Sequence, residues 1–204
     1  RLNRFVKNGG HILYTFKSGF SDQNVKVRAA VQPGIIGEAC GISYSQFTTP
    51  EHLGLKDDPF HVGNDNVIKT FMELITPKTA KVLAYYDHPV WGKYAAITQN
   101  NYGKGLATYI GCMTSEAITE KVIENVVKSA GLWRADQELK FPLIVKSGIN
   151  QYGKAVHYYF NYSAAPASLI YSYKSGTELL SNTAIPLKSK VDIGAWGVKI
   201  VEEK

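Results

Sequence analysis

Two cysteines, Cys40 and Cys112, are the only thiols among the 204 residues. Cys112 follows a run typical of a buried strand and comes shortly before a predicted helix, whose dipole and free N–H groups could lower the pKa of the thiol. A nucleophile elbow, however, needs glycines on both sides of the nucleophile. Gly111 precedes Cys112, but Met113 follows it. We therefore interpret Cys112 as a small apolar packing residue.

Cys40 lies in the segment Gly37-Glu38-Ala39-Cys40-Gly41, which resembles the Gly-x-Cys-x-Gly of class I glutamine amidotransferases. It departs from that motif at Glu38, and it follows a helical turn that begins with proline instead of a strand. None of the five histidines begins a His-x-Glu sequence. A thiol without a base to activate it is a poor nucleophile, so we expect both cysteines to be structural.

The carboxylates show no catalytic pairing. A retaining glycosidase needs two carboxylates on rigid strand ends, one to attack while the other donates a proton. Here the acids fall on one exposed helix face, in a long loop and at the tail: Glu116, Glu120 and Glu124; Asp57 and Asp58; Glu202 and Glu203. The sequence therefore predicts that this chain alone is not an enzyme and has no catalytic residue.

Neither a metal site nor a sugar site is the preferred interpretation. His52 and His61 could join nearby aspartates around a metal, but their spacing is irregular and no cysteine supports it, so we predict a solvated loop and neither metal nor cofactor. The tyrosines after residue 133, with Trp196, could form a sugar-stacking platform. Tyrosine is also a favoured strand residue, and packing is the preferred interpretation.

One loop is placed where an open α/β sheet holds its ligands. Residues 17–24 follow the carboxyl end of the first predicted strand, which is the functional edge of a parallel sheet. Asp22 and Asn24 could bind the backbone of a partner or stabilise the turn, and both alternatives remain open. The predicted interface or ligand-edge residues are Ser18, Gly19, Asp22, Asn24 and Trp91.

A helix, a glycine stop and a strand precede this loop. Leu2, Phe5 and Val6 have helical spacing, and Asn8-Gly9-Gly10 supplies the left-handed conformation that ends a helix. Residues 11–16 are then apolar, as in a strand that is covered on both faces. Because this helix–glycine–strand pattern belongs to parallel sheets, it predicts an α/β fold.

Further elements follow along the first part of the chain. The pattern predicts a short helix from Pro33 to Gly41, an extended piece to residue 47, and a long surface excursion over 48–66. A strand is expected at 81–86, and strands at 94–98 and 106–110 form a hairpin. Thr114 is the predicted cap of a helix that Gly131 ends.

The pattern changes from Trp133 onward. Residues 139–201 contain short β-like runs separated by turn residues, and residues 156–162 alternate with period two. This texture predicts an antiparallel sandwich of six or seven strands. The predicted domains are residues 1–134 and residues 135–204.

Several segments carry a family resemblance: RFVKNGGHILYTFKSGFSDQN, QPGIIGEACGI, AKVLAYYD and AAITQNNYGKGLATYIGC. They resemble the trimerisation domain of glycoside hydrolase family 42 β-galactosidases, and the final β-rich stretch resembles the small C-terminal domain of those enzymes. The resemblance implies a flavodoxin-like, amidotransferase-like doubly wound sheet. It also implies a parent enzyme that hydrolyses terminal β-D-galactosides with retention, on a catalytic barrel that lies outside this chain.

The same resemblance implies that the partners are further copies of the chain, in a homotrimer, and the parent's barrel. Because the sequence begins within a helix, we expect the first domain to lack strands at its amino end. The formal charge is +6, but Lys and Arg are spread along the chain, so a nucleic-acid footprint is not indicated. The alternatives are a carbohydrate-binding module and an independent amidotransferase-like hydrolase.

Overall fold

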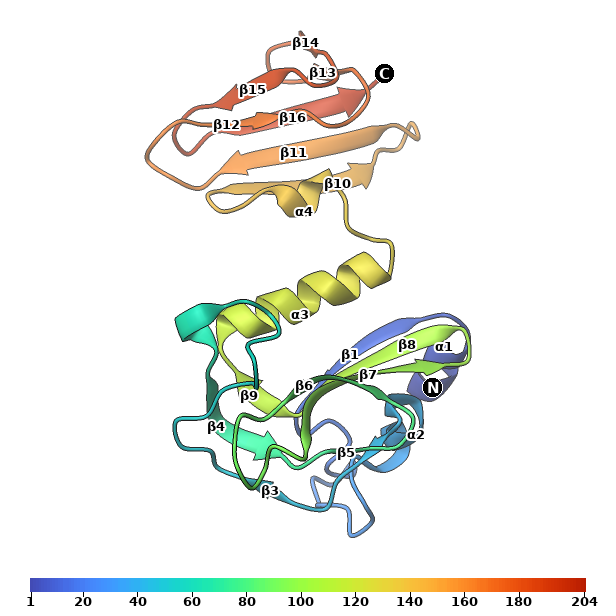
Figure 1. The fold of residues 1–204 in the computed structure, drawn as a ribbon. Coiled ribbons are helices and arrows are strands. Elements are labelled where there is room, and N and C mark those ends of the chain that lie inside the picture. The colour runs from blue at the N-terminus through green and yellow to red at the C-terminus, as the bar shows by residue number, and fades with distance from the viewer. The chain divides into compact units, whose positions relative to one another are not determined.

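The computed structural model describes all residues from 1 to 204, in two compact units, residues 1–132 and residues 133–204 (Figure 1). The helices of the first unit are α1 (Leu2–Lys7), η1 (Gly34–Ile36), α2 (Gly37–Cys40), η2 (Gly63–Asp65) and α3 (Glu116–Ser129). Its strands are β1 (His11–Thr15), β2 (Ile42–Ser43), β3 (Phe47–Thr48), β4 (Ile68–Glu73), β5 (Thr76–Pro77), β6 (Lys81–Tyr85), β7 (Ala95–Tyr102), β8 (Gly105–Ile110) and β9 (Cys112–Thr114).

The main sheet of the first unit has the strand order β1-β8-β7-β6. β1 pairs with β8 in parallel, from His11 opposite Leu106 to Thr15 opposite Ile110. The other two pairs are antiparallel, and β7 and β8 form the predicted hairpin. The unit is therefore a mixed α/β structure with one parallel pair, where the sequence predicted a parallel sheet.

Helices pack against both faces of this sheet because its side chains alternate between two apolar clusters. On one face, Ile97 and Ile110 pack with Ile118 and Val122 of α3. The second cluster joins further sheet residues to α1 and α2: Tyr14, Ala95, Ala107 and Tyr109 with Val6, Ala39 and Cys40. The sheet consequently has a core on each side.

β1 is less buried than its composition predicts. Of its five residues only Tyr14 is buried, because β1 is the end strand and pairs on one side alone. In α1, Val6 is fully buried, whereas Leu2 and Phe5 are exposed. Leu13 nevertheless packs against the first cluster and Ile12 and Tyr14 against the second, so β1 is covered on both faces, as expected, and is open only along its unpaired edge.

The segment 48–66 is anchored in the core, although the sequence predicted a surface excursion. Leu53, Leu55 and Phe60 are buried in the first cluster, and bridges join Leu53 to Ile68 and Leu55 to Tyr86. Leu53 and Leu55 have the period-two spacing of a strand, which places both on one side of the chain.

The ends of the helices follow local chemistry. Gly41 closes α2 in the left-handed conformation, and Gly131 follows α3 with a positive φ, both as predicted. The cap of α3 is Ser115, whose hydroxyl accepts the N–H of Ile118, and not Thr114. The Thr114 hydroxyl instead meets that of Thr119.

The second unit consists of antiparallel strands after one short helix, α4 (Ala135–Glu138). Its strands are β10 (Leu143–Ile149), β11 (Ala155–Asn161), β12 (Ala167–Ile170), β13 (Gly176–Glu178), β14 (Thr183–Ile185), β15 (Lys190–Ile193) and β16 (Val198–Glu203). A five-stranded sheet, β10-β11-β16-β13-β14, and the β12–β15 pair share one apolar cluster. The predicted antiparallel arrangement is confirmed. No helix of the chain has both the length and the apolar character needed to cross a membrane.

Candidate functional site

Both thiols lie inside the first unit. Cys40 and Cys112 are buried, and burial raises the pKa of each to about 12 from an ordinary value of 9.0. Cys112 lies in β9, beside Tyr86 and Glu73, and α3 begins only after the Ser115 cap. A thiol with this pKa is protonated near neutral pH, so neither position offers a nucleophile.

A buried carboxylate that the sequence analysis missed lies at the end of β4. Glu73 is fully buried; its Oε2 accepts the Tyr109 hydroxyl at 2.8 Å and its Oε1 accepts the N–H of Lys17 at 2.7 Å. Burial raises the pKa of Glu73, and the Lys17 N–H opposes this shift. An acid within the run Phe71-Met72-Glu73-Leu74-Ile75 was the signal that could have identified it.

The loop that follows β1 begins at Lys17. Because the Lys17 N–H donates to the Glu73 carboxylate, Glu73 holds the start of this loop in place. At Gly19 the chain passes close to the next segment: a Cβ there would lie 2.3 Å from the carbonyl oxygen of Pro33. Asp22 Oδ1 accepts the N–H groups of Asn24 and Lys26 at 2.8 and 3.0 Å. Asp22 therefore stabilises the turn, which was one of the two alternatives, and its carboxylate stays at the surface.

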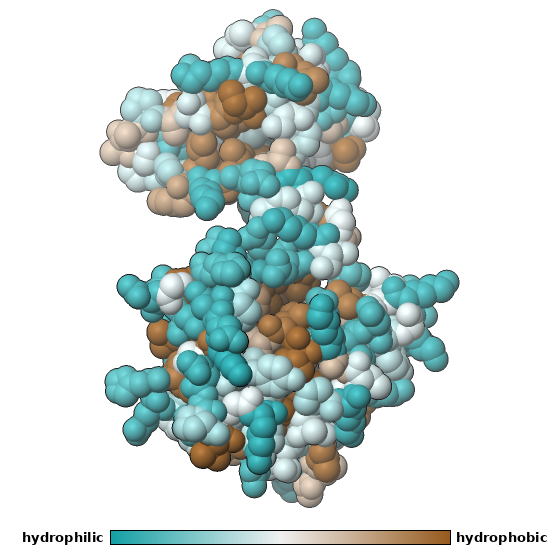
Figure 2. Space-filling model, in the orientation of Figure 1, coloured by the Kyte–Doolittle hydropathy of each residue, from teal (hydrophilic) through white to brown (hydrophobic).

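An exposed apolar surface continues from this loop. We call it the 25–35 surface and define it by Val25, Val27, Val31 and Ile35, of which Val25 is 82% and Ile35 74% exposed. A groove of about 740 Å³ runs along it, and its lining also includes Asp22, Lys26 and Arg28. Hydrophobic residues are visible at the surface of the first unit in Figure 2. Apolar patches of this kind mark interaction sites.

Trp91 contacts different residues from those of the loop 17–24. Its ring stacks on His88 at 4.1 Å, and His88 Nδ1 accepts the N–H of Trp91. Trp91 packs against the first cluster, whereas Phe20, next to Gly19, packs against the second. The structure thus brings Ser18, Gly19, Asp22 and Asn24 together in one loop but does not join Trp91 to them.

The second unit contains a polar chain that resembles a catalytic triad. Ser147 Oγ lies 2.8 Å from His157 Nδ1, and His157 Nε2 lies 3.0 Å from Glu203 Oε1. The Ser147 hydroxyl donates to Asp136 Oδ2 at 3.0 Å, so its proton is held by a carboxylate. His157 itself is buried. The arrangement orients side chains and does not present an activated nucleophile.

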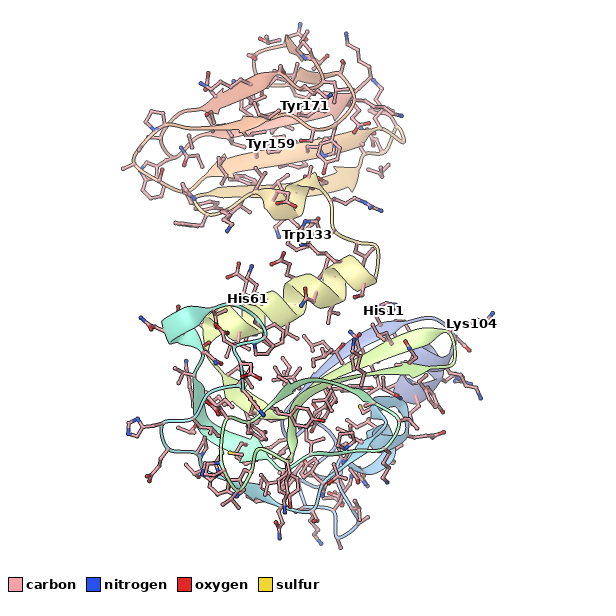
Figure 3. All side chains as sticks on the ribbon, in the orientation of Figure 1. His11, His61, Lys104, Trp133, Tyr159 and Tyr171 are labelled. Atoms are coloured by element: carbon pink, nitrogen blue, oxygen red, sulfur yellow. The ribbon has the colours of Figure 1, made fainter.

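Two of the six tyrosines of this unit are core residues. Tyr159 and Tyr171 are buried and pack edge to face, with ring centroids 6.4 Å apart (Figure 3). Trp196 is exposed. Packing, the preferred interpretation, holds for Tyr159 and Tyr171, and Glu203 belongs to β16 and engages a buried histidine instead of lying in a free tail.

Comparisons with known proteins agree over the whole chain. The family model described as the β-galactosidase trimerisation domain matches residues 1–133. The β-galactosidase LacA of Lactobacillus acidophilus is 25% identical over 203 residues, which cover 98% of this chain and 29% of that protein. The β-galactosidase BbgII of Bifidobacterium bifidum is 31% identical over 139 residues, covering 65% of this chain and 20% of the relative.

Solved structures share the fold. The β-galactosidase from Bacillus circulans sp. alkalophilus superposes with a TM-score of 0.84 at 23% identity, covering 100% of this chain and 30% of that one. The β-galactosidase from Rahnella sp. R3 gives a TM-score of 0.81 at 20% identity, with the same coverage. Where nearly the whole chain is matched, it spans about three tenths of the length of the related protein.

Proposed function

The chain belongs to the β-galactosidase trimerisation domain family, and from this premise we propose that it is the assembly and C-terminal region of a longer β-galactosidase. The parent enzyme would hydrolyse terminal β-D-galactosides with retention. Its catalytic glutamates would lie on a barrel outside these residues. In this proposal the chain contributes contacts between subunits and with the barrel, and no catalytic group.

The 25–35 surface is the observation that carries this proposal. Its four side chains are exposed on one segment and lie next to the loop that Glu73 fixes. A closed ring of three subunits needs a heterologous contact, in which one patch meets a different patch on the neighbour. We assign the 25–35 surface to one side of that contact. Ser18, Gly19, Asp22 and Asn24 would form its polar rim, and Trp91 remains a separate interface candidate.

The finer fold assignment and the domain boundary belong to the same proposal. A flavodoxin-like, doubly wound arrangement is supported by the parallel β1–β8 pair and by helices on both faces of the sheet. A boundary at 134/135 is supported by the division into compact units at 132/133. The second domain would be a small antiparallel β-sandwich.

Assay of the purified chain with a chromogenic β-galactoside tests the catalytic part of this proposal. We expect no turnover, because binding alone does not stabilise an oxocarbenium-like transition state without a positioned acid and nucleophile. The control is a catalytically competent β-galactosidase in the same buffer. Turnover that survives purification and disappears when an acid of this chain is replaced would refute the proposal.

A further inference from the structure

A cavity of about 240 Å³ opens in the second unit between α4 and the tyrosine-rich core. Its lining combines two acids with aromatic and aliphatic side chains: Asp136, Glu138, Tyr159, Tyr173, Leu139 and Leu169. Neither acid forms an ion pair with a basic side chain. The cavity is therefore rich in hydrogen-bond acceptors and has an apolar wall.

The polar chain described above supports two walls of this cavity. The Ser147 hydroxyl donates to Asp136 Oδ2 at 3.0 Å, and the same hydroxyl lies 2.8 Å from His157 Nδ1. The His157 ring also stacks on Tyr173, with centroids 3.8 Å apart and planes at 13°. Glu203 fixes His157 at 3.0 Å. One buried histidine thus orients both an acid and an aromatic ring of the cavity, as in a preorganised binding site.

Tyr159 is the buried group that points to a ligand. Its side chain is only 2% exposed and lines the cavity, yet its hydroxyl makes no hydrogen bond within the chain. Burial, and then the charge of Asp136, raise the pKa of Tyr159, so the hydroxyl keeps its proton. The Tyr159 hydroxyl is not among the fully buried atoms without a partner, and a tyrosine hydroxyl that has no protein partner and remains accessible is available to a bound molecule.

The distribution of the polar groups selects among ligands. An alkylammonium ion carries its donors at one point, whereas the cavity spreads its polar groups over Asp136, Glu138, Tyr159 and Ser172. Hydroxyl groups around a ring match this spread, and the C–H face of the same ring fits Leu139 and the tyrosines. The volume suits a single sugar ring.

We propose that this cavity binds a neutral, hexose-sized polyol in its pyranose form. Ligand hydroxyls donate to the carboxylates of Asp136 and Glu138, one of them pairs with the Tyr159 hydroxyl, and the apolar face packs on Leu139. The inference goes beyond assembly and does not depend on it, because every residue involved belongs to the second unit.

The test is a titration of the whole chain with D-galactose and with methyl β-D-galactopyranoside, followed by protein-detected NMR. We expect saturable shifts confined to residues around the cavity, with a Kd of about 1 mM. Tyr159→Phe removes only the unpartnered hydroxyl and should weaken binding about three- to tenfold. The matched control is Tyr158→Phe, the preceding residue of β11, which is exposed and should bind like the wild type.

A second variant tests a residue that orients the cavity lining and does not line the cavity itself. His157→Gln should weaken binding as well, and circular dichroism of both variants checks that the fold is kept. Absence of saturable shifts in the wild type at about 100 mM sugar, some 100-fold above the expected Kd, would overturn the proposal. So would equal binding by Tyr159→Phe and Tyr158→Phe, or saturation by Nα-acetyl-lysine methylamide in place of the sugars. Oligomeric state, measured on the same samples, reports on assembly independently.

Discussion

At the scale of single residues, Glu73 is the most constrained polar group of the first unit. A fully buried acid is costly unless its oxygens are paired, and here Tyr109 and the Lys17 backbone pair one oxygen each. The Tyr86 hydroxyl donates to the backbone carbonyl of the same residue at 2.8 Å. Glu73 thereby joins β4 to β8 and to the loop that begins at Lys17.

Replacing Glu73 should show what this pairing contributes. Glu73→Ala leaves the Tyr109 hydroxyl and the Lys17 N–H unpaired, so we expect a loss of about 3 kcal/mol in the free energy of unfolding. Chemical denaturation measures this loss. The control is Glu120→Ala, an exposed acid of α3, which should change stability by no more than about 0.5 kcal/mol. A cost for Glu73→Ala as small as that of the control would contradict the assigned role.

The pH dependence of stability gives a second reading of Glu73. Burial raises its folded-state pKa above the ordinary 4.5, so above pH 4.5 the folded state binds more protons than the unfolded state. Its contribution is fully present below pH 4.5 and is lost as pH rises through the folded-state pKa. Glu73→Gln cannot titrate, so its stability relative to the wild type should rise over that interval. A constant difference between the two proteins would show that the pKa is not raised.

At the scale of elements, α2 depends on one glycine. Gly41 has φ 64°, its carbonyl accepts the N–H groups of Lys78, Thr79 and Ala80, and a Cβ there would lie 2.4 Å from Thr79 Oγ1. Gly63 has a similar φ of 60° with no atom within 4 Å of a Cβ. Both positions have a left-handed backbone that any other residue would find strained, but only Gly41 lacks room for a Cβ atom.

This pair makes a matched test of packing at the end of α2. Gly63→Ala should lose about 1 kcal/mol from the left-handed backbone alone. Gly41→Ala should lose about 3 kcal/mol, because the added carbon also displaces Thr79 and Asn100. Thermal or chemical denaturation of both variants measures the difference. Equal losses of unfolding free energy in the two variants would mean that the residues around Gly41 rearrange to accept the added carbon without loss of stability.

Element prediction from sequence succeeded where local chemistry decides and failed where pairing decides. Gly41 and Gly131 ended their helices as predicted, because a residue without Cβ is needed at a left-handed position. The apolar run of residues 11–16 is covered on both faces as expected, but the sequence does not show that β1 is the end strand with only Tyr14 buried, since strand order is a tertiary property. β4, from Ile68 to Glu73, was not predicted; its alternation is broken where Met72 and Glu73 are both buried.

The candidate sites divide in the same way. The loop of Ser18 to Asn24 follows β1 as predicted, because its composition marks a turn. The 25–35 surface could not be predicted, since an exposed valine and a buried valine have the same sequence signature. A chain of hydrogen bonds links side chains from four elements, α4, β10, β11 and β16: Asp136, Ser147, His157 and Glu203. The spacing of these residues in the sequence does not predict it.

At the scale of the whole molecule, the chain belongs to a family defined by trimerisation, and its first unit exposes apolar side chains on one segment. Apolar residues in contact with water lower the solubility of a monomer, and burial against a neighbour removes that cost. Lys26 and Arg28 also line the groove of the 25–35 surface, so two positive charges border its apolar side chains. We propose that the trimer assembles through this surface.

The most direct test is the mass of the chain in solution, measured by light scattering over a wide range of concentration, for two matched variants. Ile35 is 74% exposed on the 25–35 surface, and Ile149 is 72% exposed at the end of β10 in the second unit. We expect the wild type and Ile149→Lys to approach three times the chain mass as concentration rises, while Ile35→Lys stays monomeric. A wild type that is monomeric at every concentration, or an Ile35→Lys variant that assembles as the wild type does, would contradict the account.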